Sequence, residues 1–474
     1  MKKPELLSPA GTLKNMRYAF AYGADAVYAG QPRYSLRVRH NDFNQLTHLE
    51  TGITEAHAQR KKFYLTCNIL PHNSKLKTFL ADLTPIIKLQ PDALIMADPG
   101  LIMMVRERWP TMAIHLSVQA NTINYATVKF WQHLGLTRII LSRELSLDEI
   151  AEIRQTCPDI ELEVFVHGAL CIAYSGRCLL SGYINHRDAN QGACTNACRW
   201  NYKVHEAKED DSGVYLLEEK ERPGKYLPIF EDEHGTYIMN SKDLRVVQLM
   251  DRLMEIGIDS VKIEGRTKSH YYTARTTQVY RQAIDDAAAG KPFDIKLMGE
   301  LDKLANRGYT EGFYRRHVPS ESQNYLFGCA NNRQQFVGEI LGYDKETGLL
   351  EIDVKNRFSI GDMLELMRPQ GNLHFTLEFM ENQQGERLSV APGSGYIVRI
   401  RAPVQDEVPC GLLLKDLGMG NGEWGMGNLL FFLLLPKLSD SFLEYVVSLL
   451  FFWVSLKCHR LYLNLIFHYI KKFV

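Results

Sequence analysis

The chain has no excess of charge of either sign, because 55 Lys and Arg residues balance 55 Asp and Glu residues among 474. A chain without net charge has no general attraction to nucleic acid or acidic membranes, so either partner would require a local basic patch. No apolar run follows the opening MKK, and the N-terminus therefore predicts no signal peptide. We expect a cytoplasmic protein, in whose reducing surroundings clustered cysteines are more often metal ligands or catalytic groups than disulfides.

Several signatures of known chemistry are also lacking. The chain contains neither a GxSxG nucleophile elbow at a strand–helix turn nor the zinc-protease pattern HExxH. GNGEWG, near the C-terminus, fits the spacing GxGxxG, but no predicted strand precedes it, and we assign it no dinucleotide.

What the chain does have is a repeated alternation of short apolar segments with amphipathic, helix-like ones. The strand candidates are PELLSP, DAVYAG, KKFYLTCN, DALIMAD, IHLSVQAN, RIILSREL, ELEVFVHG and DSVKIEGR. Strands that alternate with helices pair in parallel, and eight such units predict an α/β fold with a closed (β/α)8 TIM-like barrel. A doubly wound open sheet is the alternative.

In such a barrel the carboxyl ends of the strands form one shared mouth, where the chemistry is carried out. Polar residues occupy these strand ends: Asn68, Asp98, Gln119, Asn121, Arg143, Glu144, His167, Glu264 and Arg266. Each alone could be a solvated loop residue, whereas together they predict an active site. Glu264 and His167 are the candidate catalytic groups.

The pattern divides the chain into four parts. Residues 1–300 form the predicted barrel, with a cysteine-bearing insertion at 169–238 after the seventh strand, and 301–334 form a connection. Residues 335–414 alternate with period two between turn signals, which predicts a small antiparallel β-barrel domain. The atypical tail 415–474 has an apolar run that falls short of the roughly 20 residues of a membrane span, so we do not assign it as one. A membrane anchor and a non-native end remain its two interpretations.

Four of the nine cysteines lie close together after the seventh strand. Cys171, Cys178, Cys194 and Cys198 are separated by six, fifteen and three residues. Structural zinc usually has two short C-x2–4-C pairs, and only one pair here fits, so the spacing favours an iron–sulfur cluster over zinc. A disulfide is one alternative. A catalytic cysteine paired with His167 is another, although it leaves three thiols unexplained.

The segment EVFVHGALCIAYSGRCLLS resembles the signature of the collagenase-like peptidase family of unknown catalytic type. The matching positions are Glu163, Phe165, Gly168, Ala169, Leu170, Cys171, Gly176, Cys178, Leu180 and Ser181. ELLSPAG, GADAVYAG, NSKDL and KIEGR also resemble the family, and the similarity runs from residue 1 to about 410. After about Leu414 the family's own ending is not recognisable.

Despite the family's label, the resemblance implies hydroxylation of RNA, with a peptidase as the alternative activity. Similar members take part in forming 5-hydroxyuridine at the wobble position of tRNA by a prephenate-dependent route. Related members hydroxylate a ribosomal RNA cytidine or assist anaerobic ubiquinone hydroxylation. The resemblance also implies a 4Fe-4S cluster held by Cys171, Cys178, Cys194 and Cys198, with zinc as the alternative metal.

Two sets of binding residues follow from this implied activity. Prephenate carries two carboxylates, so cationic side chains should line the barrel mouth. The candidate substrate-binding residues are Arg266 and Arg143 first, then Arg37, Lys242, Asn68, Gln119 and Asn121. For tRNA, a basic and aromatic patch suited to phosphates and base stacking consists of Arg315, Arg316, Tyr314 and Lys268, near Tyr309. A solvated linker is the alternative for this patch.

Overall fold

The computed structural model describes residues 2–31, 33–36, 41–170, 242–315 and 333–417, together with the backbone of three strands between 214 and 237. The predicted site residues that lie outside this part are Arg37, Arg316, Cys171, Cys178, Cys194 and Cys198. Among the helices of the described part, none combines the length and the apolarity needed to cross a bilayer.

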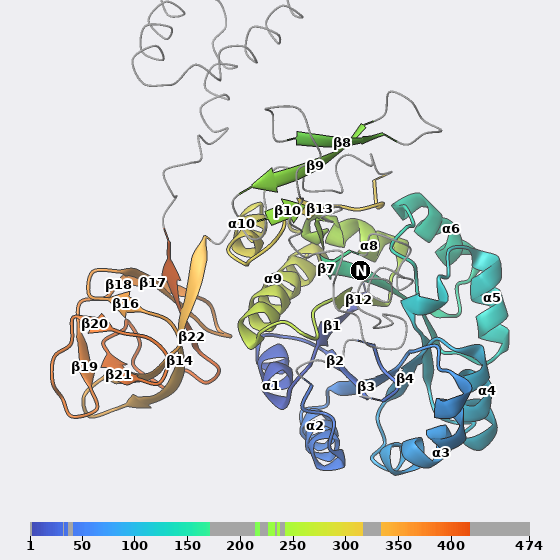
Figure 1. Cartoon of the computed structure of the whole chain (residues 1–474), viewed down its shortest axis with the longest axis horizontal. Helices are drawn as coiled ribbons and strands as arrows, with labels where there is room; N and C mark the ends of the chain where they lie inside the picture. The colour runs from blue at the N-terminus through green and yellow to red at the C-terminus, as the bar shows by residue number, and fades with distance from the viewer. Residues whose placement is uncertain are drawn as a thin grey trace, which may run out of the picture. The chain divides into compact units, whose positions relative to one another are not determined.

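Eight parallel strands close into a barrel (Figure 1). They are β1 (Glu5–Pro9), β2 (Ala26–Gly30), β3 (Lys62–Cys67), β4 (Ala93–Met96), β5 (Ile114–Leu116), β6 (Arg138–Ile140), β7 (Glu161–Ala169) and β12 (Ser260–Ile263). The first seven pair in chain order, and β12 pairs in parallel with both β7 and β1, which closes the ring. The predicted (β/α)8 barrel is confirmed, with every strand in its apolar segment, and the open-sheet alternative is excluded.

Helices surround the strands (Figure 1), so the strands are covered on their outer side and read as nearly continuous apolar runs. The helices are α1 (Leu13–Ala21), α2 (Leu46–Ala58), α3 (Asn73–Ile87), α4 (Pro99–Arg108), α5 (Tyr125–His133), α6 (Leu147–Thr156), α8 (Met250–Ile256) and α9 (His270–Ala288). Ser146 and Glu149 form a capping box that starts α6. Asp98 accepts a hydrogen bond from the Leu101 N–H (2.9 Å) and caps α4. Asp98, one of the predicted strand-end residues, is therefore the N-cap of α4.

The insertion leaves and rejoins the barrel at one place, the carboxyl end of β7. The elements concerned are β11 (Asp243–Arg245), β13 (Tyr309–Thr310), the 3-10 helix η4 (Val247–Leu249), and the insertion strands β8 (Val214–Glu218), β9 (Tyr226–Asp232) and β10 (Gly235–Tyr237). β11 runs antiparallel to β7 with Asp243 opposite Ala169, and β13 pairs with β11. The strands β8, β9 and β10 form their own antiparallel sheet. Both ends of the insertion thus lie beside the mouth of the barrel.

The predicted antiparallel domain is confirmed as a curled sheet. After α10 (Lys296–Asp302), its strands are β14 (Gln334–Asp344), β15 (Leu349–Val354), β17 (Met363–Met367), β18 (Leu373–Thr376), β19 (Met380–Asn382), β21 (Ile397–Ile400) and β22 (Leu412–Asp416), with β16 (Phe358–Ser359) paired to β20 (Val390–Ala391). The sheet order is β18-β17-β22-β14-β15-β21-β19, so β18 and β19 are edges of the described sheet. Alternate residues, such as Leu350, Ile352 and Val354, are buried in a core of its own, which explains the period-two sequence.

A buried ion pair joins the barrel to the antiparallel domain. Arg275 of α9 contacts Glu365 of β17 at 2.8 Å, and both side chains are fully buried. Lys303 and Gln334 also donate to Glu365, at 3.0 and 2.6 Å. Burial alone would raise the pKa of Glu365, but Arg275 and the other donors outweigh it and hold that pKa at about 2.

Glu365→Gln should reduce the free energy of unfolding by about 3 kcal/mol at neutral pH, because Arg275 loses its fully buried carboxylate partner and keeps Glu300 and the neutral Gln334. Urea unfolding measures the loss, and Glu255→Gln, in an exposed pair with Arg252, is the matched control. A carboxylate with a depressed pKa stabilises the fold above its unfolded pKa, so this stabilisation should disappear as pH falls from 4.5 to about 2. A difference between wild type and variant that stays constant across this window would contradict the assignment.

Candidate active site at the mouth of the barrel

A small cavity lies at the carboxyl ends of the barrel strands. It brings together five of the residues predicted from strand ends: Asn68, Gln119, Arg143, Glu264 and Arg266. Its other lining residues are Tyr28, Leu36, Thr66, Ile95, Ser117, Val118, Ile140, Phe165 and Lys262.

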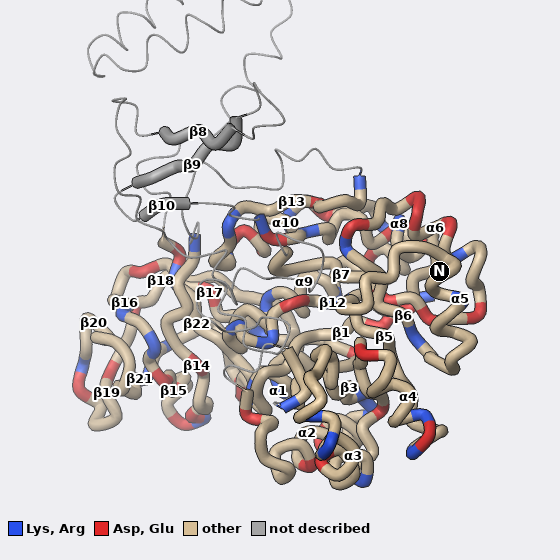
Figure 2. Tube along the Cα trace, turned by 45° about the vertical axis from the view of Figure 1, so that its right-hand side comes forward, with Lys and Arg blue, Asp and Glu red and all other residues tan. Residues whose placement is uncertain are grey.

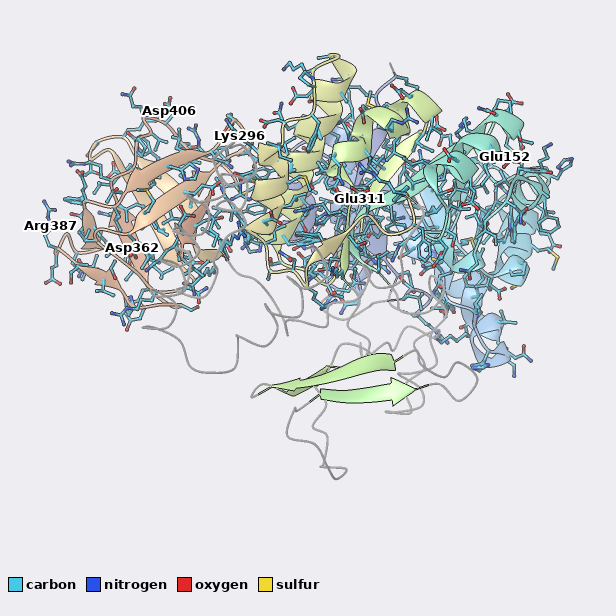
Figure 3. The ribbon with its side chains drawn as sticks, turned by 90° about the horizontal axis from the view of Figure 1, so that it is seen from above. Glu152, Lys296, Glu311, Asp362, Arg387 and Asp406 are labelled. Carbon is cyan, nitrogen blue, oxygen red and sulfur yellow. The ribbon has the colours of Figure 1, made fainter. Side chains whose placement is uncertain are left out.

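Charged side chains in this cavity are buried, unlike most charges of the molecule. Lys and Arg are interspersed with Asp and Glu over the barrel and the antiparallel domain (Figure 2). Glu152 on α6 and Arg387 and Asp406 on the antiparallel domain lie at the outer side of their elements (Figure 3). Arg143 and Arg266, by contrast, are only 6% exposed each. Burying a charge is costly unless it is paired, so these two guanidinium groups require specific partners.

The guanidinium of Arg266 donates hydrogen bonds to two side-chain hydroxyl groups and one backbone carbonyl. Its Nη1 donates to Ser35 Oγ (2.7 Å) and Thr66 Oγ1 (2.6 Å), and Nη2 donates to the carbonyl of Leu36. Gly30, the last residue of β2, makes room for this group, because a Cβ there would lie 2.5 Å from Nη1. These three acceptors therefore fix the position of the guanidinium at the cavity.

Gly30→Ala should displace Arg266 from the cavity and lower activity much more than stability. An overpacked methyl group costs about 1–3 kcal/mol of stability, whereas the added Cβ would overlap both Arg266 Nη1 and Ser35 Oγ. Gly299→Ala is the control, since nothing lies within 4 Å of a Cβ at that position. Thermal unfolding measures the loss of stability, and nucleoside analysis for the RNA hydroxylation implied by the sequence resemblance measures the loss of activity. Full activity in Gly30→Ala would show that the position of Arg266 does not matter.

Arg143 approaches the cavity from the end of β6. Its guanidinium stacks 4.0 Å from the ring centroid of Phe165, and Nη1 donates to the carbonyl of Ala169 at 2.8 Å. Nη2 lies 3.6 Å from Glu264 Oε2. Its Nε has no hydrogen-bond partner among the described residues. The Arg143–Ala169 bond also ties the cavity to the point where the insertion begins.

Amide side chains complete the polar wall between the two arginines. Asn68 Nδ2 donates to Ser117 Oγ (3.1 Å), while its Oδ1 accepts from the Leu36 N–H (3.2 Å). Ser117 also accepts from the Gln119 N–H at 3.3 Å. Among the residues that line this cavity in the described part there is no histidine or cysteine. No Ser–His or Cys–His pair of the peptidase kind is therefore formed by this lining.

The sequence of this chain matches two models of one protein family. The model of peptidase family U32 matches residues 11–324, and the model of the U32 C-terminal domain matches 332–415. The chain belongs to peptidase family U32. It is 62% identical over 443 residues to tRNA hydroxylation protein P of Escherichia coli K12, a match that covers 88% of this chain and 97% of that protein.

Two further relatives of this U32 chain also act, by their names, on RNA. The tRNA hydroxylation protein P of Haemophilus influenzae is 60% identical over 445 residues, covering 88% of this chain and 96% of that protein. The 23S rRNA 5-hydroxycytidine C2501 synthase of Escherichia coli is 34% identical over 327 residues, covering 69% of this chain and 44% of that enzyme. The resemblance inferred from the sequence motif is confirmed at the level of the family.

Three of the described residues predicted to be catalytic or substrate-binding lie outside the cavity lining. His167 is buried among the rings of Tyr272, Tyr280 and Tyr309, with centroids 5.5–5.9 Å away. Burial, followed by the charges of Arg245 and Lys268, lowers the pKa of His167 to about 3, so the ring is neutral at pH 7. Its position does not match the predicted catalytic role at the mouth.

A bulge explains the position of His167. The pairing of β12 with β7 runs from Lys262 opposite Phe165 to Ile263 opposite His167, so β7 carries one extra residue, Val166. A bulge re-aims the side chains that follow it, and here His167 packs among the tyrosines of α9 and β13. Strand periodicity cannot reveal a bulge of this kind.

Asn121 and Lys242 are likewise not among the cavity-lining residues. Asn121 ends the short helix η1 (Val118–Ala120) in the left-handed conformation (φ 51°). Lys242 is partly buried, and its aliphatic carbons lie 3.6 Å from where a Cβ of Gly308 would stand. The substrate-binding role of these two residues remains a prediction.

The residues of the predicted RNA-binding patch differ in exposure: Tyr314 is buried, Lys268 is partly buried and Arg315 is exposed. Tyr314 is only 4% exposed and donates to the carbonyl of Phe165 at 2.6 Å, so its ring is a packing element and cannot stack on a base. Arg315 is exposed but pairs with Glu311 at 2.7 Å. Lys268, partly buried, lies over the ring of Tyr272. The prediction for Tyr314 is wrong because an apolar ring with a satisfied hydroxyl is more stable in the core.

Sequence reasoning missed Lys262, which lines the cavity. It is the third residue of β12 and only 3% exposed, and its Nζ donates to Glu163 Oε1 at 2.9 Å. The signal was available in SVKIE, where Lys262 and Glu264 alternate with apolar residues and thus share one face of the strand. Lys262 lies within a buried strand, where a search of strand ends does not find it.

Proposed function

We propose that this chain is an enzyme of tRNA hydroxylation that forms 5-hydroxyuridine from wobble uridine in a prephenate-dependent reaction. The observation that carries the proposal is 62% identity to tRNA hydroxylation protein P over 97% of that protein's length. At such identity and coverage the whole architecture is shared, including the barrel mouth and the C-terminal domain. The wobble uridine would have to be splayed out of the anticodon stack to reach a site within the barrel.

Arg143 and Arg266 would hold the carboxylates of prephenate. Both are buried, both line the cavity, and Arg143 Nε has no hydrogen-bond partner among the described residues. Guanidinium groups bind carboxylates through paired, charge-assisted hydrogen bonds, which are strongest away from water. Asn68 and Gln119 offer neutral donors for the hydroxyl and carbonyl oxygens of the same molecule. Glu264, 3.6 Å from Arg143, would serve as the proton carrier.

The four cysteines of the insertion are proposed to hold a 4Fe-4S cluster, with zinc as the alternative metal. No group of three or more His, Cys, Asp or Glu residues in the described part could hold a metal ion, whereas four thiolates are the donor set of such a cluster. Ala169, whose carbonyl accepts a hydrogen bond from Arg143, precedes Cys171 by two residues in the sequence. When bound, the cluster would supply one-electron redox chemistry.

Nucleoside analysis of tRNA tests this function. A bacterial strain that lacks its own tRNA hydroxylation proteins would receive the full chain, and 5-hydroxyuridine and its derivatives would be measured by mass spectrometry. We expect the chain to restore them, and to do so only when the strain can make prephenate. Unchanged 5-hydroxyuridine levels on expression of the folded chain would overturn the proposal. Restoration of 5-hydroxyuridine in a strain that cannot make prephenate would overturn the claim that the reaction depends on prephenate.

A further inference from the structure

Lys262 places a primary amine inside the cavity, within the barrel rather than on a loop. The lysine lies on β12, with Tyr28 of β2 and Phe165 of β7 around it. Its Nζ is 4.3 Å from the ring centroid of Tyr28 and 5.5 Å from that of Phe165. A lysine on a barrel strand, walled by aromatic rings, is held in one place and shielded from bulk water.

The carboxylate next to Lys262 is shared with a second cation. Glu163 accepts from Lys262 through Oε1 (2.9 Å) and contacts Arg138 through Oε2 (3.1 Å), and both carboxylate and guanidinium are buried. Arg138 also reaches Glu5 at 2.6 Å. Glu163 therefore keeps a cationic partner if Lys262 gives up its proton. Burial lowers the pKa of Lys262, against the opposing effect of Glu163, and so increases the fraction of free amine.

Three cationic groups line this one cavity: Arg143, Lys262 and Arg266. A guanidinium recognises a carboxylate, and a lysine amine reacts with a ketone. A molecule that engages both groups carries a ketone and a carboxylate, and a 2-oxo acid is the simplest compound class that has both. Glu264 follows Lys262 by two residues on the same face of the chain and also lines the cavity, where it can pass protons.

We propose that Lys262 forms an imine with the ketone of a 2-oxo acid whose carboxylate is bound by Arg143 or Arg266. The amine nitrogen bonds to the carbonyl carbon, and the carbonyl oxygen takes up a proton to give a carbinolamine. Loss of that oxygen as water, with a proton delivered through Glu264, forms the carbon–nitrogen double bond. The balance is ammonium plus ketone to iminium plus water, and no oxidant or reductant is used. This proposal builds on the proposed function, because prephenate is itself a 2-oxo acid.

Reductive trapping tests the imine on the full chain. Phenylpyruvate and sodium cyanoborohydride would be added to the wild-type protein, and the labelled peptides would be mapped by mass spectrometry. We expect labelling of Lys262 to exceed that of the partly buried Lys242 by about tenfold or more, because desolvation favours the unprotonated amine. Phenyllactate, which has the carboxylate but no ketone, should leave no adduct and should slow the labelling by competition. Lys262→Arg keeps the charge near Glu163 and should abolish the specific adduct.

Each outcome bears on a separate claim. No adduct at Lys262, or equal labelling of Lys262 and Lys242, would overturn the imine whether or not the variant folds. If the wild-type chain and Lys262→Arg restore 5-hydroxyuridine equally, the imine has no role in the reaction. That result would leave the proposed function intact. Specific trapping by a chain that has no effect on tRNA would support the imine and remove the proposed function.

Discussion

Arg266→Met should lower the 5-hydroxyuridine content of tRNA about 10- to 100-fold when the variant replaces the wild-type chain, the factor that corresponds to losing a charge-assisted hydrogen bond worth about 1.5–3 kcal/mol. The buried guanidinium is held in place by Ser35, Thr66 and Leu36. It lines the cavity, where it can contact the carboxylate of a bound molecule. Mass spectrometry of tRNA nucleosides from the complemented strain gives the ratio.

The matched control for this variant is Arg252→Met, which removes an exposed arginine that pairs only with exposed Glu255 among the described residues. Arg266→Lys keeps the charge but has no planar fork, so its activity should lie between those of the wild type and Arg266→Met. Circular dichroism and unfolding curves exclude misfolding as the cause. Equal 5-hydroxyuridine levels with Arg266→Met and Arg252→Met would mean that Arg266 takes no part in the reaction.

Cys194→Ala should remove most of the iron and sulfide from anaerobically purified protein, by about tenfold or more, because a 4Fe-4S cluster held by three thiolates is far less stable than one held by four. The same variant should lose tRNA hydroxylation. Cys157→Ala is the control, since that thiol is buried at the end of α6 beside the carbonyl of Tyr125, the first residue of α5. Elemental analysis, acid-labile sulfide and the visible absorption spectrum measure the change. Stoichiometric zinc without sulfide in the wild type would contradict the cluster and favour zinc.

The fold was predictable because its signals are local and repeated. Each barrel strand is a short buried run such as AVYAG or ALIM, and capping residues such as Ser146 mark where a helix begins. Parallel pairing and closure then follow from the number of units. The antiparallel domain was predictable for the same reason, since its alternation of buried and exposed residues is visible in the sequence.

The candidate site was predictable only where it depends on strand ends. Arg143, Glu264 and Arg266 were found because the carboxyl ends of parallel strands meet in one place. His167 was misplaced because a bulge at Val166 adds one residue to β7. Tyr314 was misplaced because its hydroxyl finds the Phe165 carbonyl within the core, a contact between residues 149 positions apart. Such long-range contacts leave no periodic trace in the sequence.

Calorimetric titration of prephenate into the anaerobically purified full chain tests the central claim, that the cavity at the barrel mouth binds the carboxylates of the small molecule. The account predicts one binding site per chain, with affinity about tenfold or more weaker in Arg143→Met and in Arg266→Met, as expected for one lost charge-assisted contact. Affinity in Arg252→Met should be unchanged. Absence of binding to the wild type, or equal affinity in all three variants, would contradict the account.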